Sequence, residues 1–298
     1  TPARVGKTKT CRDAEREQNM TGNHITEDEL EQYAQSLYAE EKSRVTVEKY
    51  VHDVRYFARY AGIRPITKEL TLAYKRELRE HGYAIRSANS MLASLNSFLS
   101  FCGRSDCRVR LYRMQRQVYQ TADRELTKAE YRRLLSAARE NTRLWMVLQT
   151  ICSTGIRVSE LQYFTVDAVR RGEITVECKS KTRSILLPGK LKTLLLQYAH
   201  MSGITEGMIF RTRTGRPLDR SNIWTAMKRL CVKANVNPGK GFPHNLRKLL
   251  ARTFYSIEKD IAKLADILGH SSINTTRIYI MTTGAEHRRL LERMELLA

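Results

Sequence analysis

The chain has 298 residues, enough for two domains, and its 52 lysines and arginines against 31 acidic residues give a formal charge of +21. This excess favours a polyanionic partner, with nucleic acid ahead of an acidic membrane surface. The sequence has no apolar run of about 18 residues, no apolar signal segment, and six cysteines without paired or zinc-finger spacing, which excludes a membrane-spanning chain, a disulfide framework and a structural zinc site.

Residues 1–24 are polar and basic and lack periodic apolar positions, so we expect a disordered arm or the remnant of an arm domain there. From residue 25 onward, apolar residues recur at helical spacing through residue 103, with capping signals at Thr26, Thr67 and Ser87. The pattern predicts a small bundle of four short helices over residues 25–103.

Residues 104–125 are predicted to be a basic linker. Residues 104–116 contain a single acid, Asp106, and five arginines: Arg104, Arg108, Arg110, Arg113 and Arg116. A solvated linker usually mixes both charge signs, whereas a run of one sign is typical of a segment that lies on phosphates. These arginines are therefore the candidate DNA-binding residues outside the second domain.

The second domain is predicted over residues 126–298. Thr127 opens it with capping-box spacing, and helical patterns follow as far as the segment TGIRVSEL, which we expect to begin another helix. Two short strand candidates, 174–176 and 184–187, flank the polar turn CKSKT and predict a β-hairpin. Further helical segments follow, so this domain should be mainly helical with a small sheet.

Basic and nucleophilic side chains stand in five short motifs of this domain: Arg157 in TGIRVSEL, Lys179 and Lys181 in CKSKTR, His244 and Arg247 in HNLR, His270 in LGH, and Tyr279 in TTRIY. Residues three apart share one helix face, so His244 and Arg247 can reach the same phosphate. Each motif alone is common by chance. In this order they resemble the signature of the tyrosine recombinases, the phage integrase and Xer family, most of all the integrases of bacterial mobile elements.

The resemblance implies a mainly α fold with a small β-hairpin. Residues 25–103 would form a helical core-binding domain that clasps DNA, and residues 126–298 an α+β catalytic domain that ends in a tail helix. It also implies the activity of a site-specific recombinase, which cuts and rejoins DNA through a 3′-phosphotyrosyl intermediate. Neither ATP, a metal nor another cofactor is expected.

The resemblance assigns the phosphate and the nucleophile to three residues. Arg157 and Arg247 would bind the non-bridging oxygens of the scissile phosphate, because a guanidinium donates to two oxygens and stays charged at any working pH. Tyr279 would attack the phosphorus and hold the strand in a covalent link. Glu160 is expected to brace its helix or a basic neighbour and has no catalytic role.

The remaining roles concern protons. His244 would take or relay the proton of the tyrosine, and His270 would hydrogen-bond a phosphate oxygen. The family's leaving-group acid is a hairpin lysine, and here CKSKTR departs from the common form G-K-G-x-K-x-R. Lys181 is preferred, with Lys179 as the alternative.

The tail after residue 287 has apolar residues on one helix face: Leu290, Leu291, Met294 and Leu297. This face could pack on its own domain; the resemblance implies instead that it docks on a neighbouring protomer of a homo-tetramer. The expected partners are double-stranded DNA, the other protomers and an accessory directionality factor, with no membrane. We expect a cytoplasmic, nucleoid-associated bacterial protein.

Two alternatives remain beside the integrase. A Xer-type resolvase of chromosome or plasmid dimers would use the same chemistry, and the basic leader in residues 1–24 favours the integrase over it. The alternative from another class is a catalytically silent DNA-binding regulator. The intact set of candidate catalytic residues argues against a silent site.

Overall fold

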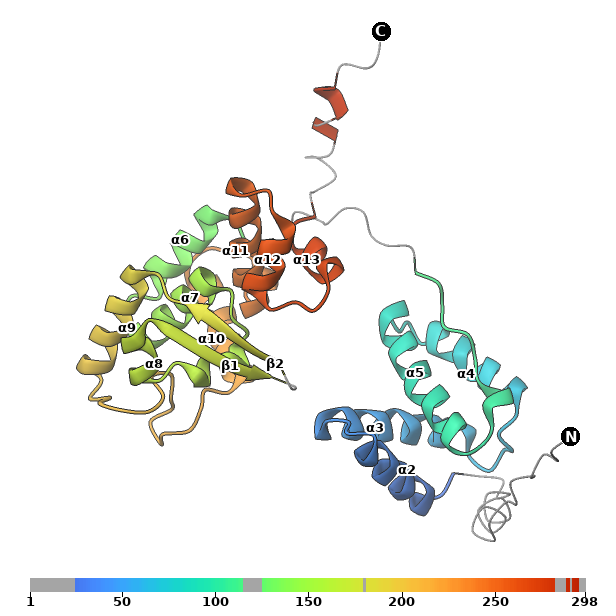
Figure 1. Cartoon of the computed structure of the whole chain (residues 1–298). Helices are drawn as coiled ribbons and strands as arrows, with labels where there is room; N and C mark the ends of the chain where they lie inside the picture. The colour runs from blue at the N-terminus through green and yellow to red at the C-terminus, as the bar shows by residue number, and fades with distance from the viewer. Residues whose placement is uncertain (1–24, 115–124, 179–180, 282–287, 290, 295–298) are drawn as a thin grey trace, which may run out of the picture. The chain divides into compact units, whose positions relative to one another are not determined.

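The computed structural model describes residues 25–114, 125–178, 181–281, 288–289 and 291–294 (Figure 1). By its internal contacts the chain divides into two compact units, residues 1–116 and 117–298. Within the described ranges, no helix has the length and apolar character needed to cross a lipid bilayer. The described strands form one two-stranded sheet among many helices, so the predicted fold class is confirmed.

The described part of the first unit is a helical bundle followed by a short 3-10 turn: α2 (Glu27–Ala39), α3 (Arg44–Ala61), α4 (Lys68–Glu80), α5 (Ile85–Phe101) and η1 (Ser105–Cys107). Each α-helix buries the apolar stripe that its 3.6-residue periodicity creates. On α2 this stripe is Leu30, Tyr33 and Leu37.

The first helices begin where capping chemistry predicts. Thr26 Oγ1 accepts from the amide of Glu29 at 3.2 Å, and the Glu29 carboxylate accepts from the Thr26 amide at 2.9 Å, which closes a capping box. The predicted cap at Ser87 is wrong, because α5 begins at Ile85 after Ala84, without a side-chain cap. Ile85 is already partly buried, so packing starts this helix before the local capping signal.

Two asparagines of α5 fasten the start of the predicted basic linker. The side-chain amide of Asn96 accepts from the Val109 amide at 2.9 Å and donates to the Val109 carbonyl at 2.8 Å. Asn89 makes the same pair of bonds with Tyr112, at 2.8 and 2.9 Å. The compact part of the first unit therefore continues beyond residue 103, to Tyr112.

Side chains alternate along this extended segment. Cys107 and Val109 are buried, whereas Arg108 and Arg110 are exposed. Arg113 is also exposed, Arg104 is partly buried, and Arg116 lies outside the described residues. The backbone amides of the segment thus pair with α5 while most of its described arginines face solvent.

The described part of the second unit contains these elements in order: α6 (Lys128–Ala137), α7 (Thr142–Thr154), η3 (Val158–Tyr163), α8 (Val166–Arg171), β1 (Glu173–Cys178), β2 (Lys181–Leu186), α9 (Gly189–Met201), α10 (Arg220–Lys233), η4 (Pro238–Lys240), α11 (Pro243–Ile257), α12 (Ile261–Leu268) and α13 (Ile273–Tyr279). The strands are antiparallel, from Glu173 opposite Leu186 to Cys178 opposite Lys181. Each strand is longer than its predicted segment.

The TGIRVSEL segment forms a 3-10 helix, η3, instead of the predicted α-helix. Gly155 ends α7 in the left-handed region, with φ of 66°. A β-carbon at Gly155 would lie 2.5 Å from Cδ2 of Leu250 in α11 and 2.9 Å from Cδ2 of Leu268 in α12. Glycine is therefore needed at this position for two reasons: the left-handed turn that ends α7, and the close packing of α11 and α12 against it.

Helix α7 organises the core of the second unit. Leu148 and Ile151 on it are fully buried, and α11 packs against it through the buried Leu246. Helices α12 and α13 follow α11 directly and gather beside it (Figure 1). This arrangement brings the end of α7, the start of α11 and the ends of α12 and α13 to one place.

Candidate active site

Tyr279 is the last residue of α13 and is only 6% exposed. Its hydroxyl lies 3.0 Å from Nε2 of His244, in the first turn of α11. Its ring centroid lies 5.0 Å from those of both His244 and His270. The phenol is thus placed against an imidazole that can accept its proton.

Arg247 is a buried cation that pairs with no carboxylate among the described residues. Its side chain is 1% exposed, and its Nη atoms donate to the carbonyl oxygens of Gly155 and Leu268. Nη2 also lies 2.9 Å from Nε2 of His270. Among the described residues Nε is buried without a hydrogen-bond partner, so the guanidinium retains an unused donor.

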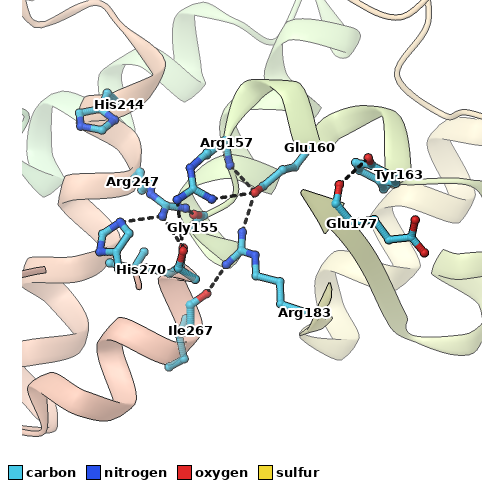
Figure 2. A network of polar contacts seen from close by, with 12 residues as sticks. Gly155, Arg157, Glu160, Tyr163, Glu177, Arg183, His244, Arg247, Ile267 and His270 are labelled. Carbon is cyan, nitrogen blue, oxygen red and sulfur yellow. Dashed lines mark hydrogen bonds and ion pairs between the residues drawn. The ribbon is translucent and has the colours of Figure 1, made fainter. Parts of the chain in front are cut away.

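Three successive carbonyls at the C-terminal end of α12 accept from three different arginines. Ile267 accepts from Arg183 at 2.8 Å, Leu268 from Arg247, and Gly269 from Arg157 at 3.2 Å. The C-terminal end of a helix carries partial negative charge, which favours cations there. The helix end therefore holds like-charged groups together (Figure 2).

Glu160 joins two of these arginines. It is 3% exposed; its Oε1 lies 2.9 Å from Nη1 of Arg157 and its Oε2 lies 2.6 Å from Nη2 of Arg183. Oε2 also accepts from the backbone amide of Arg157 at 2.7 Å, which fixes the start of η3. The Arg157 side chain remains 43% exposed, so its guanidinium is anchored on one side and open on the other.

The contacts of His270 define its tautomer. A guanidinium can only donate, so Nε2 of His270 accepts from Arg247. Its Nδ1 lies 2.9 Å from the hydroxyl of the fully buried Thr276, to which a neutral ring donates from that nitrogen. Thr276 therefore orients the ring beneath Tyr279.

Both histidines are held neutral near pH 7. Burial lowers the pKa of His244 to about 4, and neighbouring cations, Arg247 first, contribute in the same direction. Burial likewise lowers the pKa of His270 to about 4, again with Arg247 as the largest of the contributing charges. Burial also lowers the pKa of Arg247 to about 10, which leaves its guanidinium protonated at neutral pH.

The structure brings together these predicted residues: Arg157, His244, Arg247, His270 and Tyr279. Lys181 begins β2, but its side chain and the whole of Lys179 lie outside what the structure describes. Within the described residues, no cluster of histidine, cysteine and carboxylate side chains is arranged to hold a metal ion.

Two contributors were not predicted from the sequence: the orienting hydroxyl of Thr276 and the Arg183 side chain. Glu160 braces the start of η3 and its basic neighbours, as predicted. Thr276 stands in the TTRIY motif, three residues before the tyrosine, which is the helical spacing that would have indicated a shared site. The Arg183–Glu160 pair spans 23 positions and has no signal of local spacing.

Residues 124–286 match the Phage integrase family, and residues 30–105 match the phage integrase N-terminal SAM-like domain. Among curated proteins, the chain is 30% identical over 278 residues to tyrosine recombinase XerA of Thermococcus kodakarensis. The alignment covers 90% of this chain and 95% of that protein.

Solved structures of similar fold include a lambda integrase tetramer bound to a Holliday junction, with a TM-score of 0.70 at 18% identity, covering 92% of this chain and 81% of that one. The Tn1549 transposon integrase in complex with transposon right end DNA has a TM-score of 0.68 at 15% identity, covering 90% and 99%.

The neutral histidines predict a pH dependence of stability. Their pKa values in the folded protein, about 4, lie below the ordinary 6.5, so the unfolded chain binds more protons as the pH falls. This contribution is complete above about pH 6.5 and is lost as the pH falls toward 4. We expect the thermal midpoint to drop between pH 7 and 5, and to drop less in His270→Asn.

Scanning calorimetry at constant ionic strength measures this difference. His200→Asn, on an exposed position of α9, is the matched control and should keep the wild-type slope. Equal slopes in all three proteins would show that His270 is not held neutral by the fold.

Proposed function

The chain belongs to the Phage integrase family and is a tyrosine recombinase; from this premise we propose that it is the integrase of a mobile element and forms its 3′-phosphotyrosyl bond at Tyr279. The observation that carries the proposal is the 3.0 Å contact between the Tyr279 hydroxyl and Nε2 of His244, beside the arginine cluster. Similar folds seen with a Holliday junction and with transposon end DNA support duplex DNA as the substrate and a tetramer as the working assembly. The predicted association with the nucleoid would follow from the same proposed substrate, duplex DNA.

In the first step the Tyr279 oxygen forms a bond to phosphorus while the bond from phosphorus to the 5′ oxygen breaks. One phosphodiester replaces another, so no ATP is consumed. The phenol proton passes to Nε2 of His244, which is free to accept it because its low pKa keeps the ring neutral. Attack by a 5′ hydroxyl on the phosphotyrosine reverses these transfers and seals the strand.

The arginines bind the charge that develops on phosphorus oxygens. Arg247 has five N–H donors, of which its backbone and His270 contacts use three. The remaining donors, including the unpartnered Nε–H, can bind one oxygen, and the exposed side of Arg157 can bind another. Fixed donors of this kind act without reorganisation during the reaction.

His270 would donate to a phosphate oxygen from Nε2, which requires the other tautomer. The Thr276 hydroxyl allows this exchange, because it can donate to Nδ1 as readily as it accepts from it. Arrival of a phosphate that takes the Arg247 donor would free Nε2 for this role. The pair of His270 and Thr276 can thus form a hydrogen bond both in the substrate-free site and with a phosphate bound.

A Xer-type resolvase is the second candidate function. It is favoured by the 30% identity with XerA over 90% of this chain, whereas the basic leader in residues 1–24 favours the integrase. The two functions share their chemistry and differ in substrate. Covalent trapping on the ends of a resident mobile element, compared with a dimer-resolution site, would separate them. An accessory directionality factor stays a prediction.

The first unit offers a surface for the DNA backbone. Exposed Arg108, Arg110 and Arg113 lie on one extended segment, and the Lys75 ammonium donates to the Arg110 carbonyl at 2.7 Å. Each phosphate contact steepens the salt dependence of binding. A variant with Arg108 and Arg110 both replaced by alanine should bind more weakly and with a shallower salt slope; an unchanged slope would remove these residues from the interface.

The tail is proposed to dock on a neighbouring protomer. Its described apolar residues, Leu291 and Met294, are 55% and 51% exposed, and a helix this short is marginal alone in water. Leu290 and Leu297 lie outside the described residues. Deletion after Arg289 should leave the thermal midpoint unchanged and impair cooperative assembly on DNA in a gel-shift titration. A destabilised monomer that still assembles would assign the tail to its own domain.

Tyr279→Phe tests the nucleophile. The variant loses only the attacking oxygen, so it should bind target DNA with near wild-type affinity and form no covalent adduct. A gel shift measures binding, and a denaturing gel with a nicked suicide substrate measures the adduct. Tyr255→Phe in the neighbouring helix α11 is the matched control and should form adduct normally; the reverse result would move the nucleophile.

Lys181 is proposed as the leaving-group acid, with Lys179 as the alternative. Loss of general acid catalysis costs about 10²- to 10⁴-fold in rate. Lys181→Ala should show this loss on ordinary DNA and recover on a 5′-bridging phosphorothiolate, because sulfur leaves without a proton. Recovery in Lys179→Ala, without recovery in Lys181→Ala, would assign the role to Lys179.

A further inference from the structure

Arg183 holds the hairpin against the active site through contacts with two other segments. From β2 it reaches the carboxylate of Glu160 in η3 at 2.6 Å and the carbonyl of Ile267 in α12 at 2.8 Å. Its side chain is only 16% exposed. A strand residue with two such partners fixes its own backbone more firmly than a surface ion pair would.

Gly269 gives independent evidence for this placement. A β-carbon at Gly269 would lie 2.6 Å from Cδ of Arg183 and 2.8 Å from its Nε. The Arg183 stem therefore lies directly on the backbone of the LGH motif, where any side chain would displace it. The same glycine accepts from Arg157 through its carbonyl, at 3.2 Å.

The hairpin is held at both strands close to its turn. On β1, the Tyr163 hydroxyl donates to the Glu177 carbonyl at 2.8 Å (Figure 2). On β2, Arg183 stands two residues after Lys181, which pairs with Cys178 at the end of the described ladder. Apolar packing by Ile174 and Ile185, which lie opposite each other, fixes the other half of the hairpin. Among the described residues of β2, Arg183 is therefore the one closest to Lys181 whose side chain makes polar contacts with other segments.

We propose that Arg183 is a positioning residue for leaving-group protonation: it fixes the start of β2 on Glu160 and on the end of α12, so that the lysine of the hairpin stands at the departing 5′ oxygen. This inference rests on the proposed function, in which a hairpin lysine supplies that proton. Arg183 itself touches neither the nucleophile nor the histidines in the described contacts. Its loss should therefore be felt in the protonation step.

The test compares two substrates in the full chain. Arg183→Ala should form covalent adduct on the order of 10²-fold more slowly than wild type on ordinary suicide DNA, because a small displacement of a catalytic group has this cost. On the 5′-bridging phosphorothiolate it should approach the wild-type rate. A variant equally slow on both substrates would overturn the proposal, since a general loss of structure or of phosphate binding is not relieved by a better leaving group.

Two further variants make the result specific. Arg183→Lys keeps the charge but has one ammonium in place of a fork, so it should lie between wild type and Arg183→Ala and should also recover on sulfur. Arg170→Ala removes an exposed arginine of α8 and is the matched control, with wild-type rates on both substrates. If Arg183→Ala does not fold, the comparison between Arg183→Lys and wild type decides in the same way.

A double variant separates this inference from the proposal it rests on. Arg183→Ala combined with the alanine variant of the lysine that sulfur rescues should be no slower than that lysine variant alone. Additive losses would overturn the positioning role. If wild type forms no adduct on any substrate, the proposed function fails; if lysine variants recover on sulfur and Arg183→Ala does not, only the present inference fails.

Discussion

The end of α12 is the constraint on which the site depends. Three consecutive carbonyls there accept from guanidinium groups that come from β2, α11 and the start of η3. Three cations so close would repel one another, and Glu160 alone cannot neutralise them. The partial negative charge of the helix end, and of the α7 end at Gly155, offsets part of the remaining repulsion. Because this compensation comes from dipoles and a single carboxylate, the cluster keeps a net positive charge for a phosphate.

Burial of the site has opposite consequences for its arginine and histidine side chains: Arg247 stays charged, whereas His244 and His270 become neutral. Burial lowers the pKa of Arg247 only to about 10, so its guanidinium stays protonated at neutral pH, whereas the pKa values of His244 and His270 fall to about 4 and both rings are neutral. In the proposed reaction, Arg157 and Arg247 would stabilise charge, and His244 and the pair of His270 and Thr276 would move protons.

The sequence predicted the residues of the site better than the contacts that hold them. Motif order brought Arg157, His244, Arg247, His270 and Tyr279 into one hypothesis, and capping boxes located helix starts at Thr26 and Thr127. Glu160 was expected to brace a basic neighbour, but Arg183 was not identified as that neighbour, because their contact exists only after the hairpin closes. The hydrogen bonds from the backbone amides of Val109 and Tyr112 to asparagine side chains could not be predicted, because no periodic sequence pattern indicates them. TGIRVSEL fits either helix type by spacing, and the tight bonding of Glu160 to the Arg157 amide accompanies the 3-10 form.

The hydrogen bonds from the arginines to backbone carbonyls also determine whether the side chains lose their rotamer entropy on folding or on substrate binding. Long side chains lose about 1.5–2 kcal/mol of rotamer freedom when they are fixed. For Arg247 and Arg183, which are buried and bonded before any substrate is present, that loss belongs to folding and not to association. In the proposed reaction, such preorganisation would let the free energy of phosphate contacts stabilise the transition state, because little of it would be needed to order the site. Arg157, whose side chain stays 43% exposed, is the member of the cluster with the most rotamer freedom left to lose on binding.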